Sequence, residues 1–403
     1  MDSRDRQLSE VDSPTAWRRV GLAVAVGTIG SIGMWSMPVA LPFVQADFGL
    51  TRADASLPYT LAMMGFAVGG VAMGRLCDTF GVVVTIMLGC LALSGGYVGA
   101  SIVPSPLTFA LMHLFIGVGA SATFGPLMAD MSHWFLRHRG IAVGLAASGN
   151  YIGGALWPPL LQHAMTTGGW RQTYLSVGLF CALATLPFII ALRRQARTRP
   201  IASMPEGAPN LQVSPNALMV LLCIAGLACC VAMAMPQVHI VAYCGDLGYG
   251  PARGAEMLSM MLGFGILSRV GSGVIADRWG GPATLLIGSV LQGIALSLYV
   301  LFDGLVSLYV ISAMFGLFQG GIVPMYAIIV RRYFPAREVG IRIGIVLMAT
   351  LFGMALGGWM SGAIFDHTGS YRLAFLNGLI WNVINAAIVL WLILWPTRRL
   401  ATV

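Results

Sequence analysis

One arginine, Arg269, stands inside a long apolar stretch of the chain, where a charged side chain is costly. It lies eight residues before Asp277, an acid at the end of that stretch. If the stretch is a helix, a rise of about 1.5 Å per residue puts Arg269 about 12 Å from its end. That is close to the middle of a hydrocarbon layer about 30 Å thick, where a guanidinium normally faces a cavity or a partner. A guanidinium can hold a carboxylate through two parallel hydrogen bonds, so the residue indicates a binding site for an organic carboxylate.

The residues on the same helical face as Arg269 leave space beside it. Gly265, Ser272 and Gly273 stand at positions i−4, i+3 and i+4, and none of them is an acid. The competing interpretation is a structural ion pair between Arg269 and an acid from another helix. Asp130 is the best candidate for that partner. It lies near the cytoplasmic end of its own apolar stretch, so it is expected to be too close to the cytoplasmic surface to reach Arg269.

Other polar and aromatic residues inside the apolar stretches are candidates for lining the same cavity. Their amides, hydroxyl and imidazole could hold a substituent on the ligand, although a hydrogen bond between helices explains each of them equally well. One of them, His239, could also titrate near neutral pH and carry a proton. The candidates are Phe124, Asn150, Tyr151, Gln237, His239 and Gln319.

The pattern Gly-x-x-x-Asp-x-x-Gly occurs twice, with its acids at Asp78 and Asp277, and each copy joins two apolar stretches. A carboxylate there can accept hydrogen bonds from the N-terminus of a helix in the other half of the chain. Those two helices would begin near Arg139 and near Arg342. We therefore predict a gate made by these four residues; the alternative is an ordinary loop whose acid balances nearby arginines.

The composition places these residues in a membrane. Of 403 residues, 57% are hydrophobic and only 9% are charged, whereas a soluble domain has about 25% charged residues. All 23 basic residues are arginine, so no lysine is available as a counter-ion, proton carrier or Schiff base. The net charge of +8 needs no nucleic acid to explain it, because loops on one side of a membrane carry an excess of basic residues.

Twelve apolar stretches are long enough to cross a bilayer, which takes about 20 residues for each helix. They lie at about residues 19–43, 55–77, 81–102, 106–133, 139–163, 170–192, 216–243, 253–276, 281–301, 305–331, 338–363 and 370–395. The predicted domains are an N-terminal tail (1–18), a first bundle of six helices (19–192), a linker (193–215), a second bundle of six (216–395) and a C-terminal tail (396–403).

The placement of the arginines predicts the orientation. Most of them lie in the two tails, the linker and the loops on the same side of the membrane as these segments. The opposite side holds several aspartates and few arginines: Arg52, Arg171, Arg253 and Arg372. Basic loops face the cytoplasm, so both termini and the linker are expected there. The first apolar stretch is too long for a cleaved signal peptide and is expected to remain as a span.

The two halves of the chain are related. Besides the repeated Gly-Asp-Gly pattern, Pro126 corresponds to Pro324, Phe135 to Phe334 and Gly140 to Gly340, at an offset of 198–200 residues. A parallel repeat of two six-helix halves is the architecture of the major facilitator superfamily. The predicted fold class is therefore an all-α membrane protein with twelve transmembrane helices in two pseudo-symmetric six-helix bundles.

Residues 134–153, with the sequence WFLRHRGIAVGLAASGNYIG, closely resemble the fifth-helix signature of the monocarboxylate transporter family. That signature is an aromatic residue and Phe, a basic cluster, then Ala-x-Gly, a small residue with Gly, and a final Gly. The resemblance implies alternating access and a central site between the two bundles. In that family an arginine in the eighth helix binds the substrate carboxylate, and Arg269 occupies the matching position.

Departures from the family pattern concern proton coupling and substrate charge. The family commonly has Asp or Asn four residues before the arginine, where this chain has Gly265. Animal members use a first-helix lysine, which this chain lacks, and the acidic-Gly motif before the first helix is missing. The related oxalate–formate exchangers have a second central cation, a lysine in the eleventh helix. This chain has no counterpart of it, and Arg342 is too near the cytoplasmic end to replace it. Carboxylate recognition therefore carries over better than proton coupling, and a monocarboxylate fits better than a dianion.

The chain shows no zinc-protease, phosphate-loop or nucleophile-elbow motif, so neither an enzyme nor an ATP-driven pump is expected. Its seven cysteines have no metal-binding spacing and are expected to be buried apolar residues. We therefore predict a secondary transporter of a small organic monocarboxylate, coupled to protons, in the cell (inner) membrane. Beyond these ligands and the lipid bilayer, no cofactor, metal or nucleic-acid partner is expected, and a monomer suffices. The alternatives are a proton-driven exporter of drug-like or hydrophobic compounds, which would favour an acid in the cavity, and a receptor that keeps the fold without transporting.

Overall fold

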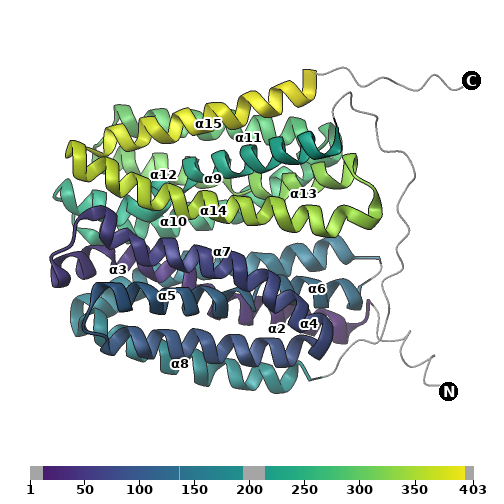
Figure 1. Ribbon diagram of the computed structural model, residues 1–403, viewed down its shortest axis with the longest axis horizontal. Helices are drawn as coiled ribbons and strands as arrows, with labels where there is room; N and C mark the ends of the chain where they lie inside the picture. The colour runs from purple at the N-terminus through teal and green to yellow at the C-terminus, as the bar shows by residue number, and fades with distance from the viewer. Residues whose placement is uncertain (1–11, 136, 194–213, 395–403) are drawn as a thin grey trace, which may run out of the picture. The chain divides into compact units, whose positions relative to one another are not determined.

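The computed structural model describes residues 12–135, 137–193 and 214–394, and every regular element within them is a helix (Figure 1). Two compact units divide the chain. The first comprises Met1–Leu50 and Leu57–Ile201, and the second comprises Thr51–Ser56 and Ala202–Val403. Most of the predicted linker (193–215) and all of the predicted C-terminal tail (396–403) lie outside the described residues, so the predicted domain boundaries stay predictions.

The first unit holds the helices from α2 to α8, with α4 belonging to it from Leu57 onward. At Gly81 the chain turns with a backbone φ of 82° and ψ of 168°. The long helix α4 therefore covers two of the predicted spans. The bounds are α2 (Pro14–Gly30), α3 (Ile32–Phe48), α4 (Arg52–Ile102), α5 (Pro106–Ser121), α6 (Gly125–Trp134), α7 (Arg139–Gly168) and α8 (Trp170–Ala191).

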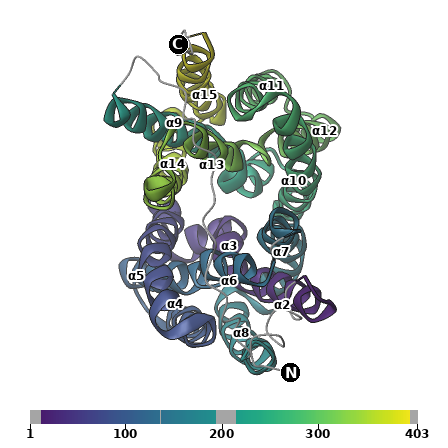
Figure 2. The same cartoon turned by 90° about the vertical axis from the view of Figure 1, so that its right-hand side faces the viewer.

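The second unit holds the helices from α9 to α15, and Figure 2 views the helices of both units nearly end-on. Gly280, between α10 and α11, has φ 82° and ψ 165°, close to the values at Gly81. The last glycine of the repeated motif thus makes the same turn in both halves, in a region of φ that favours glycine. The bounds are α9 (Pro215–Asp246), α10 (Pro251–Trp279), α11 (Gly281–Leu301), α12 (Leu305–Gln319), α13 (Ile322–Tyr333), α14 (Ala336–Thr368) and α15 (Tyr371–Leu394).

The helices match the twelve predicted spans. In the described part of the chain, ten helical stretches are long and apolar enough to cross a membrane, and α4 with its two spans is one of them. Helix α7, which is 30 residues long, corresponds to the predicted fifth span. The pairs α2–α3, α5–α6 and α12–α13 each form one stretch.

Several helices start where the local sequence favours a start. Ser13, Ser105 and Ser214 precede α2, α5 and α9, and each side chain accepts a hydrogen bond from the backbone N–H three residues on. A proline follows each of these serines. Its fixed φ suits the first helical position, where its missing N–H costs nothing.

Three of the membrane-spanning stretches are broken in the middle. The breaks lie at Ser31, at residues 122–124 and at residues 320–321. Beyond the second and third breaks stand Pro126 and Pro324, which have no N–H to donate to the carbonyl four residues earlier. Backbone groups released in this way inside a membrane must find partners on neighbouring helices.

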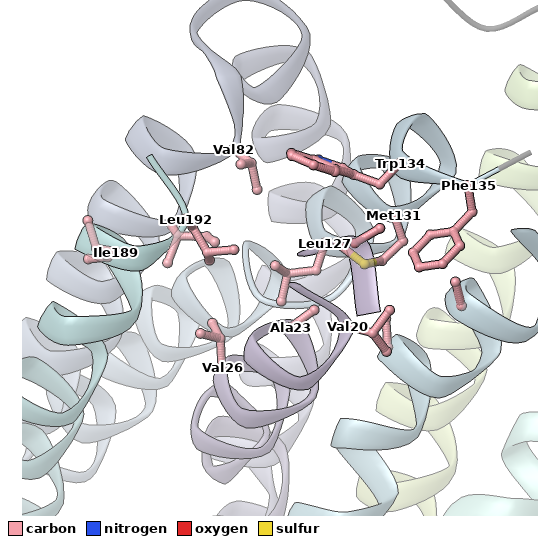
Figure 3. Close-up of a cluster of buried hydrophobic side chains, with 14 residues drawn as sticks. Val20, Ala23, Val26, Val82, Leu127, Met131, Trp134, Phe135, Ile189 and Leu192 are labelled. Atoms are coloured by element: carbon pink, nitrogen blue, oxygen red, sulfur yellow. The ribbon is translucent and has the colours of Figure 1, made fainter. Parts of the chain in front are cut away.

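A cluster of buried apolar side chains fills the meeting point of α2, α4, α6, α7 and α8 in the first unit (Figure 3). Helix α6 supplies its centre, and Figure 3 shows Leu127 and Met131 pointing toward the side chains of α2. Small residues of α2 and α7 complete the contact. The cluster consists of Ala16, Val20, Ala23, Val26, Val82, Ile86, Leu127, Met131, Trp134, Phe135, Ala142, Ala146, Ile189 and Leu192.

Candidate functional site

Arg269 lies in α10 of the second unit, ten residues before the end of that helix at Trp279. Its side chain is half-buried, and its Nε donates a hydrogen bond to the carbonyl oxygen of Gly320 at 3.3 Å. Gly320 directly follows the last residue of α12. The predicted depth of the arginine therefore coincides with a break in a neighbouring membrane helix.

The sequence explains why the Gly320 carbonyl accepts a bond from a side chain. In a continuous helix this oxygen would accept from the backbone N–H of residue 324. Residue 324 is proline and has no N–H to offer. Arg269 supplies the missing donor, so Pro324 is a sequence signal that could have identified this contact.

Very close packing brings α10 to the break between α12 and α13. A Cβ atom at Gly316 would come within 2.0 Å of the Met261 carbonyl oxygen, and one at Gly320 within 2.4 Å of the Gly265 carbonyl oxygen. Only glycine allows backbones to approach this closely. Gly265 stands where the monocarboxylate family commonly has Asp or Asn, and here its backbone lies against the broken helix.

Gln319 is the last residue of α12 and is completely buried. Within the described residues, neither its side-chain nitrogen nor its side-chain oxygen has a hydrogen-bond partner. A buried amide without partners is costly and is uncommon in folded proteins. Gln319 is next in sequence to the Gly320 carbonyl that holds Arg269, so this amide is the second polar feature of the same break.

The two candidates on α9 are both buried. His239 uses both ring nitrogens: Nδ1 lies 3.1 Å from the hydroxyl of Tyr371, and Nε2 lies 2.7 Å from the carbonyl oxygen of Gly358. Gln237 stands half a turn before it and is 2% exposed. The predicted binding role of both residues stays a prediction.

The candidates in the first unit have partners of their own. The indole Nε1 of Trp35 donates to the side-chain oxygen of Asn150 at 2.9 Å, and the Asn150 amide nitrogen lies 3.2 Å from the sulfur of Met34. The ring of Phe124, at the break between α5 and α6, lies 6.0 Å from the ring of Phe66. Tyr151 is 8% exposed. These three residues also remain predicted rather than shown ligands.

Asp130, the acid considered as a partner of Arg269, is paired within the first unit. Arg19 of α2 binds it through two hydrogen bonds, Nε to Oδ2 at 2.6 Å and Nη2 to Oδ1 at 3.2 Å. The same Nη2 donates to the carbonyl oxygen of Leu192 at 3.2 Å, and the guanidinium lies 4.7 Å from the centre of the Trp134 ring. This buried pair therefore ties α2 to α6 and to the end of α8.

The structure describes the side chains of three of the four predicted gating residues. Asp78 and Asp277 are exposed, and among the described residues neither has a hydrogen bond or an ion pair. Arg342 forms an ion pair with Glu338 one turn earlier, at 2.7 Å, and lies over the ring of Phe334. Arg139 begins α7, but its side chain lies outside the described part. The gate stays a prediction.

An unforeseen cluster of charges lies in the second unit, which includes the first turn of α4. Nη2 of Arg52 contacts both carboxylate oxygens of Asp246, at 3.0 and 3.1 Å. The carboxylate of Asp366 accepts hydrogen bonds from the backbone N–H groups of Arg52 and Ala53, both at 2.7 Å. Asp366 therefore caps the start of α4 from α14, where a negative charge also suits the helix dipole.

Replacing Asp366 by alanine is expected to destabilise the protein by about 1 kcal/mol, the usual cost of losing an N-cap. Thermal unfolding in detergent would measure the effect as a lower melting temperature. Asp303→Ala is the matched control, because the Asp303–Arg372 pair is exposed on both sides and such pairs contribute little. Equal melting temperatures for the two variants would contradict the capping role.

Comparison with known proteins identifies the class. The chain matches the Major Facilitator Superfamily model over residues 23–307 and 257–402, and it therefore belongs to that superfamily of membrane transporters. Its fold is similar to a bacterial homologue of the human lysosomal transporter Spinster in an inward-facing and occupied conformation. The TM-score is 0.75 at 13% identity, with 94% of this chain and 97% of the other covered. The predicted fold class is confirmed.

Relatives by sequence include transporters whose names indicate different functions. "Monocarboxylate transporter 13" of Bos taurus is 26% identical over 366 residues, covering 88% of this chain and 82% of the relative. "MFS-type transporter opdF" of Penicillium oxalicum is 25% identical over 350 residues, covering 86% and 81%. "Agnestins efflux protein AgnL12" of Paecilomyces divaricatus is 24% identical over 309 residues, covering 76% and 70%. The predicted resemblance to monocarboxylate transporters is confirmed, at a sequence identity of 26%.

Proposed function

We propose that this chain is a secondary active transporter that moves a small organic monocarboxylate across the membrane by alternating access, coupled to protons. The observation that carries the proposal is Arg269, a half-buried guanidinium in the middle of a membrane helix, bound through Nε to the carbonyl of Gly320. A guanidinium has five N–H donors, and the bond to Gly320 is made by Nε. In this proposal the substrate carboxylate binds the Nη edge of Arg269 through a bidentate contact.

The break between α12 and α13 supports a binding role for its surroundings. Transporters commonly place their substrate sites at interrupted membrane helices near the midplane. Gln319 supplies a buried amide with a donor and an acceptor at that break. We propose that this amide holds a hydroxyl or carbonyl substituent next to the carboxylate once the site is occupied.

The remaining predicted residues belong to the proposal without a direct contact to support them. Phe124, Asn150, Tyr151, Gln237 and His239 would contribute to the lining of the substrate path. The predicted gate would be made by Asp78 and Asp277 with the helices that begin near Arg139 and Arg342. Both termini would face the cytoplasm, the membrane would be the cell (inner) membrane, and the protein would act as a monomer.

The second candidate function is export of hydrophobic compounds, and the efflux protein among the relatives favours it. An exporter driven by protons would be expected to carry an acid beside its substrate. On α10, the position one turn before Arg269 is Gly265, whose backbone packs against Gly320. A fixed cation with no acid one turn before or after it on its own helix suits an anionic substrate better, so we favour the monocarboxylate.

Uptake by the purified protein in proteoliposomes tests the proposal. Labelled lactate, pyruvate and a panel of other monocarboxylates would be offered with and without an inward proton gradient, with oxalate as the dianion control. We expect saturable uptake of at least one monocarboxylate, stimulated by the gradient, and little uptake of oxalate. Uptake that ignores the gradient would remove the proton from the proposal. No uptake of any acid, together with proton-driven export of a hydrophobic dye, would favour the exporter.

A further inference from the structure

We propose that Ser268 is a positioning residue for the substrate carboxylate, because it fixes the peptide group that holds Arg269. The inference rests on the proposed function of Arg269. Ser268 precedes Arg269 in α10 and is 7% exposed. Its hydroxyl oxygen accepts a hydrogen bond from the backbone N–H of Gly321 at 3.0 Å, while Arg269 donates to the carbonyl of Gly320.

These two bonds hold opposite ends of a single peptide group. The carbonyl of Gly320 and the N–H of Gly321 belong to the peptide bond that joins these two residues, and that bond is planar and rigid. Ser268 therefore holds the N–H end, and Arg269 is held by the C=O end. The orientation of the Gly320–Gly321 peptide plane therefore determines the position of the carbonyl oxygen to which the Arg269 guanidinium donates.

The peptide needs such a restraint because both of its flanking residues are glycines. Glycine restricts φ and ψ least of all residues, so a peptide between two glycines can rotate at little steric cost. Pro324 also removes the intrahelical donor that would normally hold the Gly320 carbonyl along the helix axis. Without the Ser268 hydroxyl, rotation of the plane would break the Arg269 contact as well.

Packing keeps the hydroxyl within reach of the peptide. A Cβ atom at Gly321 would lie only 2.1 Å from the hydroxyl oxygen of Ser272 and 3.1 Å from the carbonyl oxygen of Ser268. The break therefore lies directly on the face of α10 that carries Ser268 and Ser272. A small shift of a binding group can cost as much as a lost contact, so Ser268 would affect substrate affinity through Arg269.

The test measures KM and Vmax for the transported monocarboxylate in proteoliposomes. Ser268→Ala is expected to raise KM about fivefold, the change that corresponds to one net hydrogen bond, with Vmax within about twofold of wild type. Ser268→Thr keeps the hydroxyl and should restore most of the affinity. Ser297→Ala is the matched control, because the hydroxyl of Ser297 in α11 donates a hydrogen bond to the carbonyl of Gly293 in its own helix.

The outcomes separate positioning from structural support. A purely structural role would reduce the amount of folded protein or Vmax and leave KM unchanged, and that result would overturn the inference. An alanine variant as tight as wild type, or a well-folded threonine variant as weak as alanine, would overturn it too. If the threonine variant does not fold, Ser268→Cys replaces it, because a thiol is a weak acceptor of similar size and should give an intermediate KM.

The variant Arg269→Gln keeps this inference distinct from the proposed function. Loss of uptake in Arg269→Gln with an unchanged KM in Ser268→Ala would leave the carboxylate site standing and remove only the role of Ser268. Absence of carboxylate uptake by the wild-type protein would overturn both.

Discussion

Arg269→Gln is expected to lower Vmax/KM for the transported monocarboxylate by at least about 100-fold while the protein still folds. The substitution removes a bidentate contact to a carboxylate, and each hydrogen bond to a charged group contributes about 1.5–3 kcal/mol. Glutamine keeps a similar length and retains donors, so the loss should come from charge and geometry rather than from an emptied space. Uptake of labelled substrate in proteoliposomes measures the effect.

Two further variants make the result specific. Arg269→Lys keeps the charge but loses the planar fork, so only part of the uptake should return. Arg253→Gln is the control on the same helix, because Arg253 is exposed and paired with Glu256 one turn away. Full uptake by Arg269→Gln would show that the arginine is structural and that the carboxylate-site hypothesis is wrong.

The position of Arg269 along its helix could be predicted from the sequence because it depends only on local quantities. The length of the apolar stretch, the position of Asp277 and the rise of a helix are enough to place the arginine in the middle of α10. The repeated Gly-Asp-Gly pattern was equally informative, since its last glycines, Gly81 and Gly280, adopt nearly the same backbone angles.

The partners of the polar residues could not be predicted in the same way. Arg19 and Asp130 are 111 residues apart in sequence, and Trp35 and Asn150 are 115 apart. Which helix faces which is decided by packing, and no local pattern records it. An isolated polar residue in a span therefore looks the same whether it binds a substrate or another helix.

The contact at the break in the tenth span could be predicted in part. In the internal repeat Pro324 is the counterpart of Pro126, but a proline also identifies the carbonyl that loses its intrahelical donor. Counting back four residues gives Gly320, the acceptor of Arg269. The sequence therefore predicts which carbonyl lacks a donor. Only the structure shows that Arg269 and Ser268 hydrogen-bond to the two ends of the Gly320–Gly321 peptide group.

The buried pair of Arg19 and Asp130 should give the largest loss of stability in the first unit. The two side chains are only 5% and 9% exposed. Removing one partner of a buried pair leaves an uncompensated charge and typically costs about 3–5 kcal/mol. Asp130→Ala would leave the Arg19 guanidinium between Trp134 and the carbonyl of Leu192, and a large drop in melting temperature in detergent is expected.

The control and the double variant decide whether charge burial is the cause. Asp47→Ala breaks the pair with Arg171 in the same unit, whose side chains are 44% and 40% exposed, and it should change the melting temperature little. Combining Asp130→Leu with Arg19→Leu removes both charges at once, so the double variant should be more stable than Asp130→Leu alone. If the double variant were the less stable of the two, the loss would have to come from packing around the apolar stem of Arg19 rather than from its unpaired charge.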